Sequence, residues 1–537
     1  MKNIQKLRKI FKTGSNIDNC QYLCYNINNK VNISNEANHM SKQKELGQYM
    51  TSDFIVKLIL NEINYTDPIH STIMEPSFGD GAFLTKIVEY IILECNKHNL
   101  SKENVMSVLQ SNVFGIEKDP ILYQKTINKL NKILEKYSIS KIDWTKQLIC
   151  GDTLLLYHQF ENTFDYVVGN PPFVRIHNIS NEYRTVLKDF QFTDGMIDLY
   201  ILFYEIGIKM LKKTGKLGFI TPNSFLKNTS QQKFRNYIIN NYYLWKLYDF
   251  KNSKIFPDAS TYTCICILNK NSEKLMKYRE YNMETVICEN IFEMETFMNK
   301  SWNFSNKNDM RFLKDNEKYE EKIKNITTVQ NGICTNLDAV YIRKFFVDKK
   351  LSIPYKNTNS SIVYFEDINE KIIEIETDLL KPCVKISTYN GIPDNTYIIF
   401  PYKNNKPISE NELKDKYPKT YFYLLSNYDK LKNRDLNKDT KWYLFARSQG
   451  LKHINEKKLI FKTIIEKQNP KIIPYILNDD TIVYSGIYIT TDNDIEEIKK
   501  IFESKDFARY CSLVGKDMNG GYVSVSSKMV KNYGIKE

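Results

Sequence analysis

The segment Asp165-Tyr166-Val167-Val168-Gly169-Asn170-Pro171-Pro172-Phe173 joins an apolar run to a turn that contains two prolines. A short apolar run that ends at turn residues is typical of a buried parallel strand. The prolines fix two φ angles and remove two backbone N–H donors, so the turn presents carbonyl oxygens, the Asn170 amide and the Phe173 ring in a stiff frame. A planar aromatic amine needs such acceptors for its N–H groups and a ring on which to stack. By itself, however, a tetrapeptide of this kind is more often an ordinary loop at a strand end.

Predicted strands and helices alternate on both sides of this segment, from about residue 44 to residue 270. This alternation predicts an α/β fold with a doubly wound, mostly parallel sheet. The predicted strands are 72–75, 113–117, 147–150, 164–168, 216–221, 244–250 and 262–268. The predicted helices are 52–63, 81–97, 120–134 and 199–213, with an additional helix over 95–111.

The chain has 537 residues, more than a single hydrophobic core usually organises, so we expect two or three domains. Residues 1–43 are polar and irregular and are predicted to form an N-terminal arm. We expect a catalytic domain over 44–275 and a charged, helical connector over 276–325. Residues 326–537, where short aromatic and β-branched runs mix with Lys, Asn and Asp, are predicted to form a mixed α/β domain.

The composition indicates a globular protein with a basic surface. Hydrophobic residues make up 42% of the chain, and 76 Lys and Arg against 63 Asp and Glu give a net charge of +13. This excess of positive charge favours a polyanionic partner. The ten cysteines lack metal-ligand spacing, and no segment has the apolar length of an export signal or a membrane span. We therefore expect a cytoplasmic protein with reduced thiols, no metal and no membrane association.

Acidic residues follow three successive predicted strands. Glu75 ends the first strand and leads into the loop Pro76-Ser77-Phe78-Gly79-Asp80-Gly81, Glu117 ends the second, and Asp152 follows the third. The carboxyl ends of parallel strands meet at one edge of the sheet, where ligands of such folds bind. A carboxylate at Glu117 suits ribose hydroxyls, and an acceptor at Asp152 suits an adenine amine. Each acid alone more often caps a helix or faces solvent, but the three together predict a nucleotide-like ligand.

Two classes of nucleotide fit this pattern less well. No Gly-Lys-Ser/Thr sequence occurs in the glycine loop, which argues against a phosphate-cradling loop. The distance from the glycines to Glu117 exceeds the roughly 20 residues of a dinucleotide fingerprint, which weakens a nicotinamide dinucleotide as the ligand.

The order of the motifs resembles that of the gamma-class (TaqI-like) adenine-N6 DNA methyltransferases of Type II modification systems. Gly47-Gln48-Tyr49-Met50-Thr51 comes first, the glycine loop follows, and the Asn-Pro-Pro-aromatic turn comes third. The resemblance implies a class I S-adenosylmethionine-dependent methyltransferase, Rossmann-like with a seven-stranded, mostly parallel sheet, and a C-terminal target-recognition domain. It also implies transfer of a methyl group from S-adenosyl-L-methionine to a flipped adenine in double-stranded DNA.

The same resemblance assigns roles to individual residues. The implied catalytic residues are Asn170, Pro171, Pro172 and Phe173. The implied cofactor-binding residues are Tyr49, Thr51, Glu75, Ser77, Gly79, Gly81, Glu117, Lys118, Asp152 and Asn170. Phe173 and Phe256 are implied to stack on the target base, although Phe256 is equally consistent with a core residue. Glu75, Ser52 and Phe173 stand where the family commonly has Asp, Pro and Tyr, and each replacement keeps the required chemistry.

The chemistry of adenine methylation accounts for the proline turn. The exocyclic amine is a poor nucleophile because its lone pair is delocalised into the ring. Hydrogen bonds to the Asn170 side-chain oxygen and the Pro171 carbonyl favour a pyramidal nitrogen with a directed lone pair, so positioning and aimed dipoles supply the catalysis. The amine lies inside a duplex, so the base has to be flipped out.

The C-terminal part is dense in basic and aromatic residues over 430–470. Sequence reading needs polar side chains at base edges and basic side chains on phosphates. The DNA-binding residues predicted there are Lys441, Trp442, Arg447, Gln449 and Lys452. The alternative is a solvated charged face, which is the usual meaning of such a run. Cys383 follows a proline, like the nucleophile of cytosine-C5 methyltransferases, but it lies far beyond the cofactor segment and is interpreted as structural.

Other functions share parts of this pattern. RNA adenine and protein glutamine methyltransferases also use an Asn-Pro-Pro-aromatic turn, although the glutamine enzymes are shorter and lack a large C-terminal domain. The intact turn argues against a catalytically inactive DNA-binding homologue. We find no nuclease motif, so we expect either the companion of a separately encoded restriction endonuclease or an orphan epigenetic enzyme. We expect a monomer on DNA.

Overall fold

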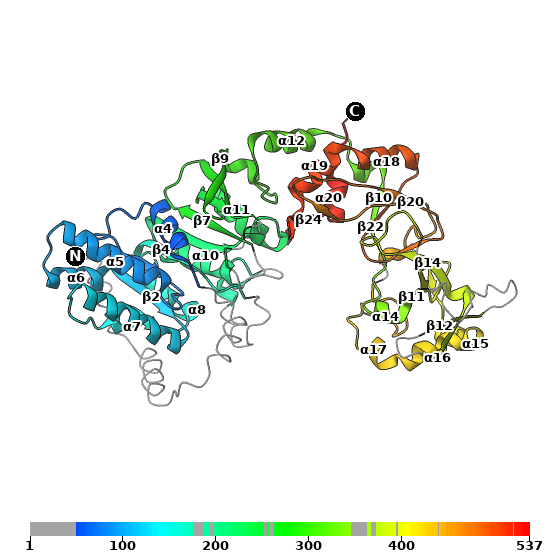
Figure 1. Cartoon of the computed structure of the whole chain (residues 1–537), viewed down its shortest axis with the longest axis horizontal. Coiled ribbons are helices and arrows are strands. Elements are labelled where there is room, and N and C mark those ends of the chain that lie inside the picture. The colour runs from blue at the N-terminus through cyan, green and yellow to red at the C-terminus, as the bar shows by residue number, and fades with distance from the viewer. Residues whose placement is uncertain are drawn as a thin grey trace. The chain divides into compact units, whose positions relative to one another are not determined.

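The computed structural model describes residues 50–174, 187–193, 198–251, 253, 255–256, 262–344, 362–366, 372–393, 396–438, 440–447, 449–518 and 520–536. The chain forms two compact units, Met1–Lys307 (unit 1) and Asn308–Glu537 (unit 2), and each is described by itself (Figure 1). The N-terminal arm predicted for residues 1–43 lies outside the described residues.

Unit 1 is built on one large sheet. Its strands are β1 (Ile73–Glu75), β2 (Val113–Glu117), β3 (Leu148–Cys150), β4 (Phe164–Gly169), β5 (Leu211–Pro222), β6 (Leu244–Asp249), β7 (Thr263–Asn269), β8 (Leu275–Asn282) and β9 (Thr285–Glu293). They lie in the order β3-β2-β1-β4-β5-β7-β6-β8-β9. The five strands from β3 to β5 in this order are parallel, whereas β7 is antiparallel to both of its neighbours. All seven predicted strands are confirmed, with small shifts at most ends and an earlier start for β5.

Helices pack on both faces of this sheet. They are α4 (Asp53–Glu62), α5 (Ala82–Lys97), α6 (Lys102–Asn112), α7 (Pro120–Lys136), α8 (Thr153–Leu156), α10 (Leu199–Met210) and α11 (Gln232–Asn240), so the four predicted helices and the additional one are confirmed. A Cβ atom on Gly218 of β5 would lie 2.7 Å from Ile59 of α4, whereas Gly207 of α10 abuts the adjacent Leu217. Successive side chains of a strand point to opposite faces, so α4 and α10 cover opposite faces and the unit has three layers (Figure 1).

The ends of the helices that follow the strands have a local cause in the sequence. Asp119 accepts hydrogen bonds from the backbone N–H groups of Ile121 and Leu122, and Pro120 occupies the first turn of α7. Asp152 caps α8 in the same way through Leu154. An Asp at the N-cap satisfies backbone donors that have no partner within the helix. These caps start both helices directly behind β2 and β3, so the helix N-termini lie at the same sheet edge as the strand ends.

The helical connector predicted for residues 276–325 is wrong over its first part. Residues 275–293 form β8 and β9, which extend the sheet from the expected seven strands to nine, and a helix begins only with α12 (Lys307–Lys318). Met276 and Tyr278 are buried, while the intervening Lys277 and the following Arg279 form ion pairs with Glu289 of β9. Charged side chains on one face of these strands produced a pattern that reads as a surface helix. Unit 2 accordingly begins at Asn308 rather than at residue 326.

Among its described residues, unit 2 contains two large hydrophobic cores and a smaller cluster around Ile386 and Tyr488. Its sheets are β10-β22-β18-β20, β11-β15-β14-β21, β19-β24-β23, β12-β13 and β16-β17. The strands are β10 (Thr328–Asn331), β11 (Ile342–Lys344), β12 (Ile362–Glu366), β13 (Ile372–Glu376), β14 (Leu380–Val384), β15 (Thr396–Ile399), β16 (Tyr402–Lys403), β17 (Lys406–Pro407), β18 (Lys458–Ile460), β19 (Ile464–Glu466), β20 (Tyr475–Leu477), β21 (Ile482–Val483), β22 (Ile487–Thr490), β23 (Lys516–Met518) and β24 (Tyr522–Ser524). The mixed α/β character expected of this part is confirmed.

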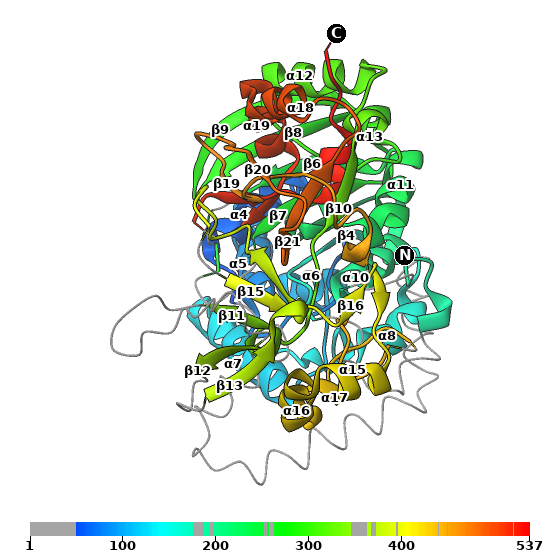
Figure 2. The ribbon, with the colours of Figure 1, turned by 90° about the vertical axis from the view of Figure 1, so that its right-hand side faces the viewer.

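The helices of unit 2 divide between the two cores. Besides α12, they are α13 (Ile323–Ile326), α14 (Asp338–Tyr341), α15 (Glu410–Lys416), α16 (Pro418–Ser426), α17 (Tyr428–Lys432), α18 (Ile495–Glu503), α19 (Lys505–Val514) and α20 (Ser527–Asn532). Figure 2 shows α16 next to β13, where Glu376 accepts hydrogen bonds from the backbone N–H groups of Lys419 and Thr420 at 2.9 Å. The helices α18, α19 and α20 belong to the other core, around Phe502, Phe507 and Val530.

Across the described ranges, no helix combines the length and the apolar character that a membrane crossing requires.

Candidate active site

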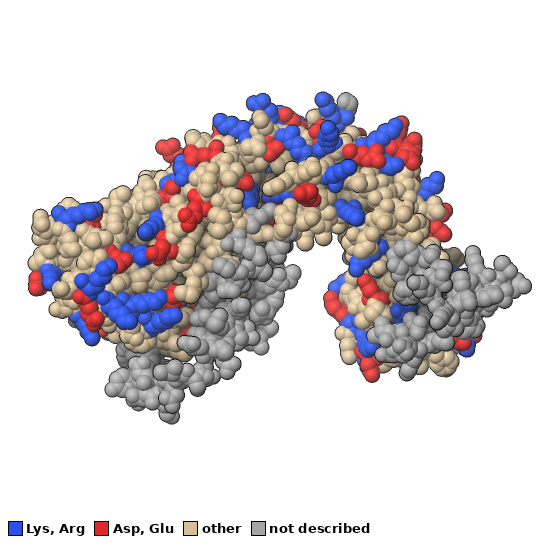
Figure 3. Space-filling view, viewed as in Figure 1, with Lys and Arg blue, Asp and Glu red and all other residues tan. Residues whose placement is uncertain are grey.

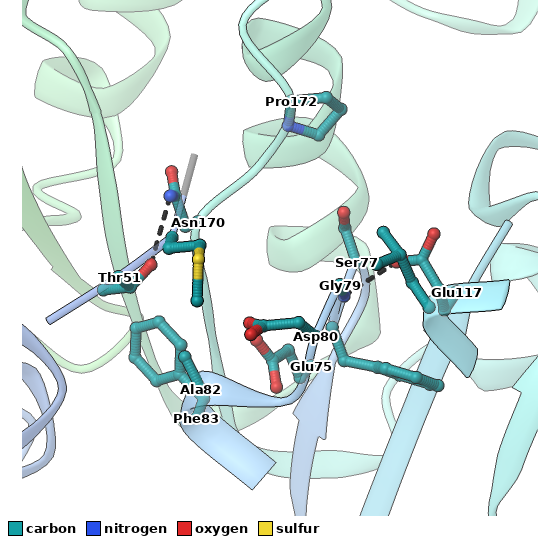
Figure 4. A pocket seen from close by; sticks show the side chains of 13 residues that line it. Thr51, Glu75, Ser77, Gly79, Asp80, Ala82, Phe83, Glu117, Asn170 and Pro172 are labelled. Atoms are coloured by element: carbon teal, nitrogen blue, oxygen red, sulfur yellow. Dashed lines mark hydrogen bonds between the residues drawn. The ribbon is translucent and has the colours of Figure 1, made fainter. Parts of the chain in front are cut away.

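A pocket opens at the carboxyl edge of the sheet in unit 1 and holds about 590 Å³ of space that is open to solvent. Figure 4 shows side chains that converge on it from the ends of β1, β2 and β4 and from the loop after β1. The lining residues are Met50, Thr51, Glu75, Ser77, Phe78, Gly79, Asp80, Ala82, Phe83, Glu117, Leu122, Asn170 and Pro172. Glu75, Glu117 and Asn170 thus meet from three strand ends, whereas Asp152, the third acid predicted at this edge, is not among the lining residues.

The loop between β1 and α5 depends on its glycines. Gly79 and Gly81 have φ angles of +52° and +84°, which side chains other than glycine adopt only with strain. A Cβ atom on Gly81 would also lie 2.6 Å from the Thr126 side chain of α7. The loop therefore turns sharply and packs directly on α7, which leaves its other side to line the pocket.

Glu75 lies at the bottom of the pocket and is 2% exposed. In the part of the chain that the structure describes, its Oε2 atom is buried and has no hydrogen-bond partner. Burial raises the pKa of Glu75 well above its ordinary value, and the carboxylates of Glu117 and Asp80 raise it further. A buried acid with an unused oxygen is costly unless a ligand completes it. The residue is therefore suited to bind a positively charged group.

Glu117 connects the glycine loop to the end of β2. Its Oε2 atom accepts a hydrogen bond from the Gly79 N–H at 2.8 Å, and its Oε1 atom accepts one from the Asp119 N–H at 2.8 Å (Figure 4). Burial raises the pKa of Glu117, while these N–H groups act in the opposite direction. The two carboxylate oxygens together have about four acceptor directions, so at least one remains for a ligand hydroxyl after these N–H groups and that of Lys118.

Asn170 reaches from the end of β4 to the opposite side of the pocket. Its side-chain nitrogen donates a hydrogen bond to Thr51 Oγ1 at 3.1 Å, so the carboxamide oxygen points away from Thr51 (Figure 4). The turn is also anchored behind the pocket, because the Leu199 N–H at the start of α10 donates to the Val174 carbonyl at 2.7 Å. The turn that is predicted to hold this amide rigidly therefore has contacts on both of its sides.

The aromatic pair predicted to stack on a base lies next to this turn. The ring centroids of Phe173 and Phe256 are 6.1 Å apart with the planes at 75°, and Phe173 contacts Tyr200 in a similar edge-to-face arrangement. Phe256 is only 3% exposed and belongs to the core of unit 1, whereas Phe173 is half-buried. The two rings are not parallel, so in this arrangement they do not form a slot for a flat ligand.

The remaining predicted cofactor residues either do not line the pocket or lie outside the described residues. Gly81, Lys118 and Asp152 are absent from its lining. Asp152 Oδ1 caps α8, and Asp152 Oδ2 forms an ion pair with Lys118 at 3.0 Å. Tyr49 lies outside the described residues.

Several lining residues were not predicted from the sequence. Phe83 and Leu122 occupy the first turns of α5 and α7, and Asp80 lies between the two glycines of the loop. The signal that could have identified them is position, because the first turn of a helix that follows a parallel strand lies at the same sheet edge as the strand end.

Two of the DNA-binding residues predicted in unit 2 have partners within that unit. The Trp442 indole N–H donates to Glu410 at 3.1 Å, and its ring packs on Tyr421 and Tyr428. Arg447 forms an ion pair with Asp435 at 2.5 Å. Lys441 and Lys452 are exposed, and the side chain of Gln449 lies outside the description. Trp442 and Arg447 therefore contribute to the packing of unit 2.

In the part of the chain that the structure describes, cysteines and other metal-ligating side chains do not form a metal site. The described ranges contain eight cysteines, and Cys383 is buried in β14. The same ranges contain no group of three or more His, Cys, Asp or Glu side chains arranged to hold a metal ion.

Comparison with known proteins gives matches over both units. Residues 4–256 match a family model described as Eco57I restriction-modification methylase. The chain is 26% identical over 417 residues to the Type II restriction enzyme and methyltransferase RM.Eco57I of Escherichia coli, which covers 68% of this chain and 39% of that protein. It is 26% identical over 430 residues to the Type II methyltransferase M.BstVI of Geobacillus stearothermophilus, with 74% and 73% covered. For M.HincII of Haemophilus influenzae the identity is 24% over 482 residues, with 86% and 82% covered.

A solved structure shares the fold of most of the chain. The Type IIL restriction-modification enzyme MmeI, in complex with DNA, superposes with a TM-score of 0.60 at 13% sequence identity. The match covers 93% of this chain and 69% of that enzyme. At this identity the likeness concerns the fold, which extends over the large sheet and over unit 2.

Proposed function

We propose, from the premise that residues 4–256 belong to the Eco57I restriction-modification methylase family, that this chain methylates the N6 amine of adenine at a specific site in double-stranded DNA. The observation that carries the proposal is the position of Asn170. Its amide lines the same pocket as Glu75 and Glu117 and is held by Thr51. An acceptor for an aromatic amine and a site for a nucleoside cofactor are thus parts of one cavity.

The cofactor of this methylase segment is S-adenosyl-L-methionine, and the pocket has the chemistry to hold it. The buried, unpartnered Oε2 of Glu75, judged over the described residues, fits the ammonium group of the methionine part. Glu117 has at least one acceptor direction for a ribose hydroxyl, and the acids around the pocket suit a cofactor with a net positive charge. When bound, S-adenosyl-L-methionine supplies an electrophilic methyl group on a sulfonium sulfur.

The residues of the turn act on the adenine amine. The Asn170 side-chain oxygen and the Pro171 carbonyl accept its two N–H groups, which orients the nitrogen lone pair towards the cofactor side of the pocket. The hydrogen bond from Asn170 to Thr51 fixes which end of the amide is the acceptor. This preorganisation means that little reorientation is needed as charge develops on the nitrogen.

Phe173 is the residue proposed to stack on the flipped base. It is half-buried beside the pocket, and its edge-to-face contacts with Tyr200 and Phe256 hold the ring in place. We assign Phe256 to the support of Phe173, because Phe256 is buried and the two rings are nearly perpendicular. Stacking by one ring is sequence-tolerant, so it contributes affinity for the extruded base and leaves recognition to other groups.

Recognition of the DNA site is proposed for unit 2, where a groove lined by both polar and apolar side chains holds about 1310 Å³ of open space. Amide and hydroxyl side chains of this kind can contact base edges and phosphates. Lys462 and Lys528 are exposed, adjoin lining residues in the sequence, and have no ion pair among the described side chains. They are placed to contact phosphates. The polar lining includes Asn331, Thr335, Asn336, Thr463, Ser485, Ser526 and Ser527.

The proposal includes a partner outside the chain. Relatives carry restriction-modification names, and one of them is named as both a restriction enzyme and a methyltransferase. We propose that this chain protects DNA against a restriction endonuclease encoded separately, and that it acts on DNA as a monomer.

The test uses the full-length chain expressed in cells that lack adenine methylation. Methylation-sensitive long-read sequencing of their DNA is expected to show N6-methyladenine at one recurrent sequence, and nucleoside mass spectrometry is expected to show the modified base in DNA. Methylated adenine in RNA alone would assign a different substrate. Absence of methylated adenine from every nucleic acid, with the purified protein still binding S-adenosyl-L-methionine, would contradict the proposal.

A further inference from the structure

Helix α7 holds the glycine loop of the cofactor pocket through two side chains on one of its faces. Thr126 Oγ1 donates a hydrogen bond to the Gly79 carbonyl at 2.9 Å. Lys129 Nζ donates to the Asp80 carbonyl at 2.7 Å and to Asp80 Oδ2 at 2.8 Å. The two side chains are three residues apart, so they lie on the same face of the helix. Neither lines the pocket, whereas Gly79 and Asp80 both do.

The loop is held from the opposite side by the end of β2. The Gly79 N–H donates to Glu117, so the peptide groups of Gly79 are bound at the nitrogen by β2 and at the oxygen by α7. Thr126 is fully buried and fills the space beside Gly81, where a Cβ atom would lie 2.6 Å from it. The position of the pocket floor is therefore set by α7 as well as by the loop's own glycines.

Lys129 also changes the charge of the pocket. Glu75, Asp80 and Glu117 are close enough for Asp80 and Glu117 to disfavour the ionised form of Glu75. The ammonium of Lys129 pairs with the Asp80 carboxylate, which keeps that side chain turned towards α7. Without this cation, the Asp80 carboxylate is free to move and the loop loses two of its three hydrogen bonds to α7.

We infer that Thr126 and Lys129 are positioning residues for the cofactor: they bind no part of it, but hold the glycine loop in the conformation that binds it. The inference deepens the proposed function and rests on it, because it concerns the same pocket. A preorganised loop loses little conformational freedom when the cofactor binds, so removing its anchors weakens binding. The chemical step depends on Asn170, which follows β4. We therefore expect the rate of that step to be unchanged when the anchors of the glycine loop are removed.

Figure 3 shows Lys and Arg side chains gathered over α7. The same helix provides a matched control for the experiment. Lys125 lies on the same helix, is exposed, and has no ion pair among the described residues. The variants are Lys129→Met, Lys129→Arg and Lys125→Met in the full chain. Calorimetry measures the Kd for S-adenosyl-L-methionine, and methyl transfer to DNA is measured at saturating cofactor.

Lys129→Met is expected to raise the Kd for S-adenosyl-L-methionine about tenfold, since it removes two charge-assisted hydrogen bonds from the loop. kcat at saturating cofactor and DNA affinity should stay within about twofold of the wild type. Lys129→Arg keeps a cation and should recover most of the affinity, and Lys125→Met should bind like the wild type. Should Lys129→Met not fold, Thr126→Val, which keeps the side-chain shape and removes the donor, is expected to raise the Kd in the same direction.

Equal Kd values for Lys129→Met and Lys125→Met would overturn the inference and leave the proposed function intact. A fall in kcat without a change in Kd would also overturn it, because the loop would then affect the chemical step. Wild-type protein that binds no S-adenosyl-L-methionine would contradict the proposed function itself, so the two failures are distinguishable.

Discussion

The cofactor pocket of unit 1 and the basic segment 430–470 of unit 2 were both singled out from the sequence, with different outcomes. Of the residues predicted for the pocket, Thr51, Glu75, Ser77, Gly79, Glu117 and Asn170 line one cavity. In the basic segment, by contrast, Trp442 and Arg447 have partners within unit 2. The proximity of residues could be predicted where topology places strand ends together. Composition alone did not indicate which side chains of the basic segment pack against their neighbours.

The physical reason is the geometry of parallel strands. Every parallel strand in a sheet ends at the same edge, so a polar residue at a strand end has a known location before any tertiary contact is considered. A Lys- and aromatic-rich segment has no comparable rule, because each aromatic side chain can pack inwards and each Arg can bind a neighbouring acid or carbonyl. Arg434 illustrates this: it donates to the carbonyls of Thr335, Trp442 and Leu444.

The largest effect on activity is expected at the proline turn, where a substitution tests the comparison between the two regions most directly. Asn170→Ala should lower kcat by about 10²–10³-fold, since it removes a preorganised acceptor at the reacting amine. DNA affinity should change little, because unit 2 supplies those contacts. Single-turnover transfer of a radiolabelled methyl group measures the rate, and fluorescence anisotropy measures DNA binding. Thr51→Val, which removes the partner of Asn170 but keeps the acceptor, should cost less activity. An Asn170→Ala variant with full activity would break the catalytic assignment.

A smaller effect is expected from the aromatic ring beside that turn. Phe173→Ala should weaken productive binding of the extruded base by about one to two orders of magnitude, because stacking contributes ~1–3 kcal/mol per base. Phe173→Tyr and Phe173→Trp keep a ring and should retain most of kcat/KM. Steady-state kinetics on a DNA duplex compare the three variants.

Phe256→Ala is the matched variant at the neighbouring ring. Because Phe256 is buried, this change should lower the free energy of unfolding by about 3–5 kcal/mol, measured by chemical denaturation. Equal losses of activity in all three Phe173 variants would refute the stacking role.

The third prediction concerns pH and Glu75. Burial, together with Glu117 and Asp80, raises the pKa of Glu75 above its ordinary value of 4.5. A cationic cofactor favours the ionised acid, so binding releases a proton when the pH lies below the raised pKa. The Kd for S-adenosyl-L-methionine should therefore fall as pH rises from 4.5 towards that pKa, by at most tenfold per pH unit, and level off above it.

Calorimetry over a pH series measures this dependence, with Glu75→Gln as the control. The variant cannot titrate at position 75, so its residual pH dependence reports the remaining titrating groups, which include Glu117 and the cofactor's own amino group. The stability of the protein without cofactor should move in the opposite direction, because an acid with a raised pKa in the folded state stabilises it most at low pH and less as pH rises. A wild-type Kd that follows the same curve as Glu75→Gln would exclude Glu75 from the binding of the cation.

The smallest effects are expected in unit 2 and would test whether the groove, rather than the stretch around Trp442 and Arg447, contacts DNA. Lys462→Ala and Lys528→Ala should each weaken DNA binding a few-fold and reduce the slope of log K against log salt by about 1, since each removes one phosphate contact. Filter binding at several salt concentrations measures both quantities. Cofactor affinity should be unaffected.

Arg447→Ala is the internal comparison for these lysines. It breaks the ion pair with Asp435 and should lower the melting temperature while leaving the salt slope unchanged. A salt slope that changes for Arg447→Ala but not for Lys462→Ala would return the DNA contact to Arg447, as predicted from the sequence.

Much of the fold of unit 1 could be predicted because its signals are local. The apolar runs that became β1 to β7, and the Asp119-Pro120 start of α7, are readable without knowledge of any distant residue. The strands β8 and β9 were missed because Lys277, Arg279 and Glu289 pair across the two strands, and such pairing is visible only after the strands are aligned. The role of Phe256 was left open for a similar reason, since burial depends on what packs over the ring.

The sequence by itself determined which chemical groups stand at the strand ends: the acids at 75 and 117, the glycine loop and the amide of Asn170. Periodicity and turn residues locate strand ends, and parallel pairing gathers them at one edge, so no long-range detail was required. Only the tertiary structure decided that Thr126 and Lys129, 47 and 49 residues beyond their partners, anchor that loop. The rotation of a helix about its axis and the partner of each polar side chain are set by packing, which a local pattern of residues does not encode.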